Sequence, residues 1–258
     1  MDLGIWPVRV EAAKLGEVLA QRLGGELFRP WWEADSQEAL SQKARFQEQF
    51  RQRSQWVLVM ATGIAARFVD GMLRDKHEDP AVVVLDEAGR HAIALVGGHE
   101  GGANVLAYRV ANAVGAIPVV TTATDAVKPL VVGIGCRKGV SEEQIERAVR
   151  NALGRGGAAG DLAAIREIAT VDLKAEEPGL VAFCQKHGIP LRVIAKRQIE
   201  ARAWVTKPSE WVRQSVGLDG VCEPCALIAS TRGRLVIPKT TLDGVAVAVV
   251  ADEWEFGS

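Results

Sequence analysis

The residues best suited to proton transfer lie in a glycine-rich stretch, VGGHEGGAN, at residues 96–104. His99 and Glu100 both have side chains that act as general acids or bases in enzymes. Glycine has no Cβ atom, so the backbone around this pair can come close to a ligand at Gly98, Gly101, Gly102 and Asn104. Glycine-rich turns also form for steric reasons alone, and the stretch by itself leaves both interpretations open.

A second polar cluster, TTATD at residues 121–125, follows the short apolar run 117–120. If that run is a strand of an α/β sheet, the cluster lies at its carboxyl end, where loops and helix N-termini converge and ligands bind. Thr121, Thr122 and Asp125 can then contact a ligand. Capping of the strand end is the alternative role for these side chains.

A third segment, GIGCRKG at residues 133–139, has the glycine spacing G-x-G-x-x-x-G. This spacing matches neither the dinucleotide fingerprint G-x-G-x-x-G nor a phosphate-binding P-loop. Cys136 is interpreted as a small residue that fills the turn, not as a nucleophile. We interpret the segment as a bare turn at a helix N-terminus that binds carboxylate or phosphate through Gly133, Gly135, Arg137 and Lys138. The ligand is therefore expected to be polyanionic and to lie between two domains.

Residues 1–127 are predicted to form an amino-terminal α/β domain with an open, mostly parallel sheet. The loop Asp86–Gly89 is of hairpin length, so one pair of strands is predicted to be antiparallel. The polar stretch Ser36–Arg53 predicts a solvated surface helix. Thr62 is the expected N-cap of a helix that carries Arg67, a candidate anion contact. The predicted strands are 3–8, 26–29, 56–61, 81–85, 91–96 and 117–120, with a further helix over 10–23.

Residues 128–258 are predicted to form a second, smaller α/β domain. Ser141 and Gln144 form a capping box for a helix over 142–153. Asp161 is the expected N-cap of a helix that ends near Ile168. The charged stretch 172–177 is interpreted as a helix entry. Further helices are predicted at 178–188, between Ser209 and Gly217 and at 224–229, and strands at 130–134, 191–195, 235–238 and 245–251.

Bulk properties exclude several classes of protein. A net charge of −1 over 258 residues argues against binding of nucleic acid, which needs a basic surface. The chain has no apolar run long enough to span a membrane and begins without signal-peptide features, so we expect a soluble cytoplasmic protein. The four cysteines are too scattered for a disulfide framework. Cys222 and Cys225 form a C-x-x-C that we interpret as small buried thiols, in preference to a redox or zinc site.

Five segments, in order, resemble the CbiG family, which comprises the cobalt-precorrin-5A hydrolases of anaerobic cobalamin biosynthesis. They are MATGIAARF (60–68), KHEDPAVVVLDEAGRHAIALVGGHEGGAN (76–104), GAIPVVTTATD (115–125), GIGCRKGVSEEQI (133–145) and GVCEPCALIAS (220–230). The chain departs from the family pattern in two places. Only Ala126–Val132 separates the third and fourth segments, where longer relatives carry a middle segment. At or near Gly97, relatives commonly have a serine, so a hydroxyl donor is lost here.

The resemblance implies a reaction that opens the δ-lactone of a ring-contracted cobalt corrinoid and releases acetaldehyde. That chemistry needs a base, a donor for the developing oxyanion and removal of a proton from the freed hydroxyl group. His99, Glu100 and Asp125 are the expected catalytic residues. No metal or cofactor of the protein's own is expected, because cobalt arrives with the substrate. The substrate is expected to contact Gly98, Gly101, Gly102, Asn104, Thr121, Thr122, Gly133, Gly135, Arg137 and Lys138.

A non-catalytic carrier of corrinoid intermediates is the alternative, because the carboxy-terminal half has stand-alone relatives in the aerobic pathway. A nucleotide-dependent enzyme is disfavoured, since neither glycine segment fits a nucleotide fingerprint. Transient contacts with other enzymes of the corrin pathway are expected. The oligomeric state is left open.

Overall fold

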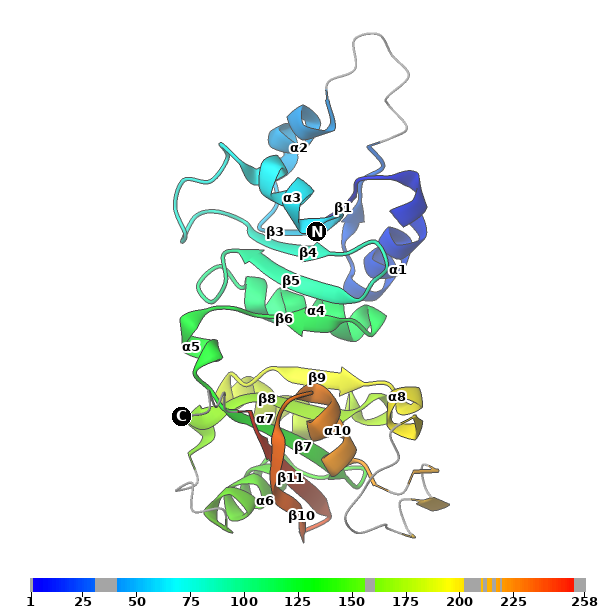
Figure 1. Cartoon of the computed structure of the whole chain (residues 1–258), viewed down its shortest axis with the longest axis vertical. Helices are drawn as coiled ribbons and strands as arrows, with labels where there is room; N and C mark the ends of the chain where they lie inside the picture. The colour runs from blue at the N-terminus through cyan, green and yellow to red at the C-terminus, as the bar shows by residue number, and fades with distance from the viewer. Residues whose placement is uncertain are drawn as a thin grey trace. The chain divides into compact units, whose positions relative to one another are not determined.

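The computed structural model describes residues 2–30, 41–155, 161–201, 210, 213–214, 217–218 and 220–252. The chain divides into two compact units, Met1–Thr122 and Ala123–Ser258, and each has its own sheet (Figure 1). The short helix α5 (Ala123–Ala126) therefore goes with the second unit, whereas the sequence placed the division after residue 127. The predicted cap at Ser209 lies outside the described residues.

The first unit contains a six-stranded sheet in the order β2-β1-β3-β4-β5-β6. Its neighbouring strands are parallel except for β4 and β5, which are antiparallel. The predicted open, mostly parallel sheet with one hairpin is thus confirmed. The strands are β1 (Leu3–Pro7), β2 (Glu26–Leu27), β3 (Gln55–Val59), β4 (Ala81–Leu85), β5 (His91–Val96) and β6 (Ile117–Val119).

Helices cover both faces of this sheet (Figure 1). Alternate residues of a strand point to opposite faces, and β3 shows this alternation: Val57 packs with α1 and α4, whereas Trp56 and Leu58 pack with α2 and α3. The sheet is therefore the middle layer of an α/β/α sandwich. The helices are α1 (Ala13–Leu23), α2 (Gln42–Phe50), α3 (Thr62–Val69) and α4 (Ala103–Val114), with a 3₁₀ turn at Val10–Ala12 before α1.

Helix α2 is more deeply packed than its polar composition predicts. Phe46 and Phe50 are fully buried, and the indole Nε1 of Trp56 donates to the carbonyl oxygen of Phe50 at 2.8 Å. Residues four apart lie on the same face of a helix, so two aromatic side chains are enough to anchor it. At the start of α3, Thr62 is the first helical residue and Ala61 is the N-cap, without a side-chain hydrogen bond. The predictions of a solvated helix and of a Thr62 cap were wrong.

The second unit contains a five-stranded sheet in the order β10-β11-β7-β8-β9. Strands β7, β8 and β9 are parallel, and the hairpin β10–β11 joins antiparallel to β7. Helices α6 and α7 pack on one face, and α8 and α10 pack on the other. The elements are β7 (Leu130–Cys136), α6 (Glu142–Arg155), β8 (Ile165–Val171), α7 (Pro178–His187), β9 (Leu191–Ile194), α8 (Lys196–Glu200), α10 (Cys222–Ala229), β10 (Arg234–Leu242) and β11 (Val245–Ala251).

The helix predicted between Asp161 and Ile168 is instead a strand. The carboxylate of Asp161 accepts a hydrogen bond from the amide of Ala163 at 2.8 Å, but it caps only the 3₁₀ turn Leu162–Ala164. Strand β8 follows at once and lies between β7 and β9. Its β-branched residues favour a strand that is covered on both faces.

Candidate functional site

The direction of β5 decides where the glycine-rich turn lies. Because β5 is antiparallel to β4, Val96 at its end pairs with Val82 near the start of β4. A Cβ atom on Gly97 would lie 3.3 Å from the Cα atom of Ala81. His99 therefore follows the carboxyl end of β5 and lies at the amino ends of β1, β3 and β4. Helix α3, which begins at Thr62, follows the carboxyl end of β3 and thus begins at the opposite edge of the sheet.

The glycine turn folds tightly on itself and on the segment after β6. Gly97 and Gly102 have φ angles of 74° and 84°, a region that glycine adopts without strain. A Cβ atom on Gly101 would lie 2.8 Å from the carbonyl oxygen of Gly97, and one on Gly98 would lie 2.5 Å from a methyl carbon of Thr122. Steric fit therefore accounts for these glycines.

Asn104 ties the turn to the threonine cluster. Its amide nitrogen Nδ2 donates to the hydroxyl oxygen of Thr122 at 2.9 Å, and its backbone amide donates to the carbonyl oxygen of Gly98 at 3.0 Å. The structure thus brings together Gly98, Asn104 and Thr122, as the sequence predicted. Thr121 is exposed beside them.

Glu100 was expected either to orient His99 or to act as the base itself, and in the structure its carboxylate makes no hydrogen bond or ion pair with His99. Both residues are exposed on the turn, but the Glu100 carboxylate is contacted by Lys76 Nζ at 3.1 Å and by His77 Nδ1 at 3.5 Å. His99 makes no hydrogen bond or ion pair with the part of the chain that the structure describes. Its imidazole is thus exposed.

The loop that carries Lys76 and His77 is held by two aspartates. The buried carboxylate of Asp79 accepts hydrogen bonds from the amides of Arg74 and Asp75, at 2.8 and 3.1 Å, and from Arg51 Nη2 at 2.9 Å. The carboxylate of Asp75 accepts from the amide of His77 at 2.8 Å. None of these residues was predicted from the sequence to belong to the site, although KHEDP opens the second family-like segment.

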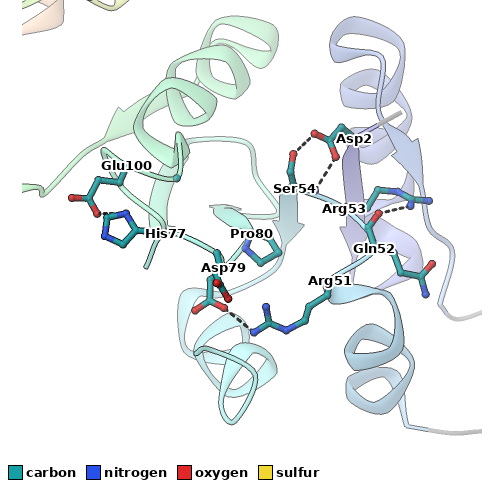
Figure 2. Close-up of a pocket in the computed structure, with 11 residues that line it drawn as sticks. Asp2, Arg51, Gln52, Arg53, Ser54, His77, Asp79, Pro80 and Glu100 are labelled. Carbon is teal, nitrogen blue, oxygen red and sulfur yellow. Dashed lines mark hydrogen bonds and ion pairs between the residues drawn. The ribbon is translucent and has the colours of Figure 1, made fainter. Parts of the chain in front are cut away.

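A polar pocket of about 510 Å³ lies among these loops (Figure 2). Figure 2 shows His77 and Glu100 facing each other at one side, and Arg51 joined to Asp79. The pocket combines acid–base groups with hydrogen-bond donors and acceptors at one edge of the sheet. Its lining residues are Asp2, Arg51, Gln52, Arg53, Ser54, His77, Glu78, Asp79, Pro80, Glu100 and Gly101.

Asp125 does not lie at the end of β6. That strand ends at Val119, and Asp125 lies in α5 of the second unit. Its carboxylate accepts a hydrogen bond from Lys128 Nζ at 3.0 Å. Asp125 thus belongs to a helical turn that follows the threonines in the chain.

The first two glycines of GIGCRKG are also not in a turn. Gly133 and Gly135 belong to strand β7, where helix α10 crosses closely: a Cβ atom on Gly133 would lie 1.8 Å from the carbonyl oxygen of Cys222. A Cβ atom on Gly135 would lie 3.2 Å from the Cβ atom of Val221. Helix packing thus explains both glycines, and their predicted contact with substrate is not supported by their positions.

The real turn after β7 does bind a carboxylate, but the protein supplies it. The amide of Gly139 donates to Glu177 Oε1 at 2.7 Å, and Lys174 Nζ donates to Glu177 Oε2 at 3.1 Å. Burial alone would raise the pKa of the Glu177 carboxyl group, but these two hydrogen bonds outweigh it and hold that pKa below its usual range. Arg137 and Lys138 remain exposed on the turn.

The four cysteines are buried and have free thiols. Burial raises the pKa of the Cys136 thiol to about 11 and that of the Cys222 thiol to about 12. A thiol that stays protonated at neutral pH is a poor nucleophile and metal ligand. These are the properties of packing residues, in keeping with the interpretation of Cys136, Cys222 and Cys225 from the sequence.

One group of side chains in the described residues has the spacing of a metal site: Glu142, Glu146 and His187, with ligand atoms within 4.8 Å of one another. Lys186 Nζ donates to both carboxylates at 2.9 Å. An ammonium ion already neutralises the two carboxylates, so the group is better described as an ion-pair network between α6 and α7.

None of the helices in the described parts of the chain is both long and apolar enough to cross a membrane.

Comparisons with known proteins agree with the resemblance seen in the sequence. The family model for the cobalamin synthesis G N-terminal region matches residues 44–125, and that for the cobalamin synthesis G C-terminus matches residues 130–250. The cobalt-precorrin-5A hydrolase of Salmonella typhimurium is 54% identical over 69 residues, which cover 27% of this chain and 20% of that protein.

Two other relatives align over longer stretches. The cobalt-precorrin-5A hydrolase of Priestia megaterium is 22% identical over 291 positions, covering 75% of this chain and 77% of that protein. Protein CobE of Sinorhizobium sp is 35% identical over 130 residues, covering 50% of this chain and 82% of that protein. With both regions of the family present in order, this chain belongs to the CbiG family of cobalamin biosynthesis proteins.

Proposed function

We propose that this chain is a cobalt-precorrin-5A hydrolase, which opens the δ-lactone of a ring-contracted cobalt corrinoid and releases acetaldehyde to give cobalt-precorrin-5B. The observation that carries the proposal is the presence of both family regions in one chain. Relatives named cobalt-precorrin-5A hydrolase support it. A turn that presents His99 and Glu100 to solvent at one edge of the first sheet also supports it.

In the first step, His99 is the general base. Its imidazole takes a proton from water, the hydroxide oxygen bonds to the lactone carbonyl carbon, and the tetrahedral intermediate collapses with cleavage of the acyl carbon–oxygen bond. The imidazolium then returns the proton to the departing alkoxide. Thr121 and Thr122, close to the turn, donate hydrogen bonds to the developing oxyanion. Asn104 holds Thr122 in place for this role.

In the second step, the freed hydroxyl group loses its proton and its oxygen–carbon bond becomes the carbonyl of acetaldehyde. The adjacent carbon–carbon bond breaks, and its electron pair passes to the macrocycle. Because the macrocycle accepts these electrons, the protein needs no metal ion or cofactor of its own for this step. Cobalt is part of the substrate.

The acetate and propionate groups at the edge of a corrinoid need positive charge. Arg137 and Lys138 are exposed on the turn after β7 and serve this purpose with their side chains. The amide of Gly139 does not, because Glu177 already accepts its hydrogen bond. We therefore propose that this turn binds substrate carboxylates through its two cations alone.

Replacement of His99 tests the assignment of the base. His99→Ala is expected to slow acetaldehyde release by about 100-fold or more, the usual scale for loss of a general base. The measurement is trapping of acetaldehyde after mixing cobalt-precorrin-5A with excess protein. His91→Gln is the matched control, because His91 is also exposed but lies at the other edge of the sheet. A His99→Ala rate within a few-fold of the parent's would refute the role of His99.

A corrinoid carrier is the second candidate. The observation in its favour is the match to CobE, which aligns with half of this chain and shows that a protein of this half length exists on its own. A carrier would bind the corrinoid stoichiometrically and return it with its lactone closed. Mass spectrometry of the corrinoid after incubation separates the two functions.

A further inference from the structure

The Glu100 carboxylate joins two segments that are far apart in the sequence. Lys76 Nζ lies 3.1 Å from its oxygens, and His77 Nδ1 lies 3.5 Å from Oε2. Both contacts come from the loop between α3 and β4, whereas Glu100 lies in the glycine turn. His77 thus has a carboxylate beside one ring nitrogen, and His99 has none among the residues that the structure describes.

This arrangement leaves the other ring nitrogen of His77 available for chemistry. A carboxylate next to Nδ1 favours the tautomer with the proton on that atom, so Nε2 has the free lone pair. The side chain of His77 is 60% exposed and lines the pocket beside the turn. The loop does not depend on the imidazole for its shape, because Asp79 and Asp75 hold the backbone.

The two steps of the proposed reaction make different demands on a base. In lactone opening, the imidazolium lies beside a negative oxyanion and soon gives its proton back. In carbon–carbon cleavage, the electron pair moves into the macrocycle, so the base keeps its proton and its positive charge until it can release the proton to solvent. A base for that step is therefore helped by a carboxylate of the protein.

Resting on the function proposed above, we propose that His77, positioned by Glu100, is the base of the second step. Its Nε2 takes the proton of the hydroxyl group that lactone opening frees. The oxygen–hydrogen electron pair forms the carbonyl bond of acetaldehyde, the carbon–carbon bond breaks, and its electron pair goes to the macrocycle. The imidazolium then releases its proton to solvent. Lys76 limits the negative charge that Glu100 presents to His77.

His91 provides a close structural control. Its Nδ1 lies 3.5 Å from Asp86 Oδ2, and its side chain is 49% exposed, so the pair resembles that of His77 and Glu100. It lies at the start of β5 in the β4–β5 hairpin, at the opposite edge of the sheet. Loss of His91 therefore removes an equivalent histidine–carboxylate pair without touching the pocket.

The experiment follows a single turnover of cobalt-precorrin-5A by the full chain, with trapped acetaldehyde and the mass of the corrinoid as readouts. His77→Gln is expected to slow acetaldehyde release by about 100-fold while lactone opening stays within a few-fold of the parent. A corrinoid with the mass of substrate plus one water then accumulates. His99→Ala is expected to leave unchanged substrate instead, and His91→Gln is expected to behave as the parent.

Variants of Glu100 separate a positioning role from a merely structural one. Glu100→Gln removes the carboxylate that lies beside His77 Nδ1, so it is expected to slow acetaldehyde release and to leave lactone opening within a few-fold of the parent's rate. Glu100→Asp keeps a carboxylate at this position and is expected to restore part of the lost rate of acetaldehyde release.

The outcomes distinguish this inference from the proposed function. If the parent chain consumes no cobalt-precorrin-5A, the proposed function is wrong and the role of His77 falls with it. If the parent is active and His77→Gln releases acetaldehyde at the parent's rate, only the role of His77 is wrong. Equal slowing of lactone opening and acetaldehyde release by Glu100→Gln would also overturn it.

Discussion

Single carboxylates organise the loops that matter most in this protein. Asp79 accepts hydrogen bonds from two amides and from Arg51, and Glu177 accepts one from the amide of Gly139. Each is buried, so each offsets its desolvation through charge-assisted hydrogen bonds. On the exposed surface, the carboxylate of Glu100 contacts Lys76 and His77.

The pH dependence of stability depends on another carboxylate, Glu146. Hydrogen bonds from Lys186, Arg150 and His187 lower the pKa of its carboxyl group from 4.5 to about 2. A carboxyl group whose pKa is lower in the folded chain than in the unfolded chain stabilises the fold at pH values above the unfolded pKa. That stability is lost as the pH falls through the folded pKa. Glu146→Gln is therefore expected to unfold at lower urea concentration at pH 7, by an amount below about 1 kcal/mol. The difference from the parent should shrink between about pH 5 and pH 2.

Glu176→Gln is the control for this measurement. Glu176 is exposed in the same unit, and within the described ranges its side chain makes no hydrogen bond or ion pair. Urea unfolding followed by circular dichroism should show no pH-dependent difference between Glu176→Gln and the parent. A Glu146→Gln difference that stays constant down to pH 3 would contradict the role of the network.

At the residue scale, the sequence predicted which kind of chemical group a turn binds better than it predicted which residue supplies that group. The turn after β7 was expected to attract a carboxylate, and it does, but the carboxylate is Glu177 of the same chain. Glu100 was expected to orient His99 or to act as the base itself, and its carboxylate contacts Lys76 and His77 instead of His99. Contacts between loops that are distant in the chain depend on how the sheet places them, and no local pattern encodes that.

At the element scale, the direction of one strand decides the location of the site. The sequence did predict the β4–β5 hairpin from its short loop, and a hairpin necessarily reverses the chain. This reversal places His99 at the amino ends of β1, β3 and β4. Strand β8 was missed for another reason: Ala163, Ala164 and Arg166 favour a helix locally, and burial between two strands overrides that preference.

The close packing of α10 on β7 predicts that replacement of Gly133 lowers the stability of the second unit. In Gly133→Ala, the new Cβ atom would lie 1.8 Å from the carbonyl oxygen of Cys222. Backbone cannot yield cheaply, so the free energy of unfolding is expected to fall by about 1–3 kcal/mol or more. In the control Gly154→Ala, no atom lies within 4 Å of the new Cβ, and helix α6 should be unchanged or stabilised by up to about 1 kcal/mol.

Urea unfolding of both variants checks this prediction. The expected order of midpoints is Gly133→Ala below the parent, and Gly154→Ala equal to or above it. A midpoint for Gly133→Ala equal to the parent's would show that helix α10 does not approach β7 as closely as the structure indicates, and the steric account of this glycine would then fail.

At the scale of the whole molecule, two units with separate sheets and cores carry the two halves of one family. The alignment to the Priestia megaterium relative spans 291 positions although this chain has 258 residues. That relative therefore contains residues that this chain lacks.

The fold class and most elements of both units could be predicted from the sequence, because hydrophobic periodicity identifies the helices and strands and glycine or proline residues indicate where they begin and end. Within the first unit, the pocket beside the glycine turn could not, because its lining comes from loops that only the sheet brings together.

Multiple turnover tests the central claim most directly. The purified chain is incubated with a large excess of cobalt-precorrin-5A, and trapped acetaldehyde is counted per chain together with the mass of the corrinoid. The account predicts many equivalents of acetaldehyde per chain and a corrinoid that has gained one water and lost one acetaldehyde. Binding of the corrinoid with no acetaldehyde, and recovery of its lactone intact, would contradict the hydrolase and favour a carrier.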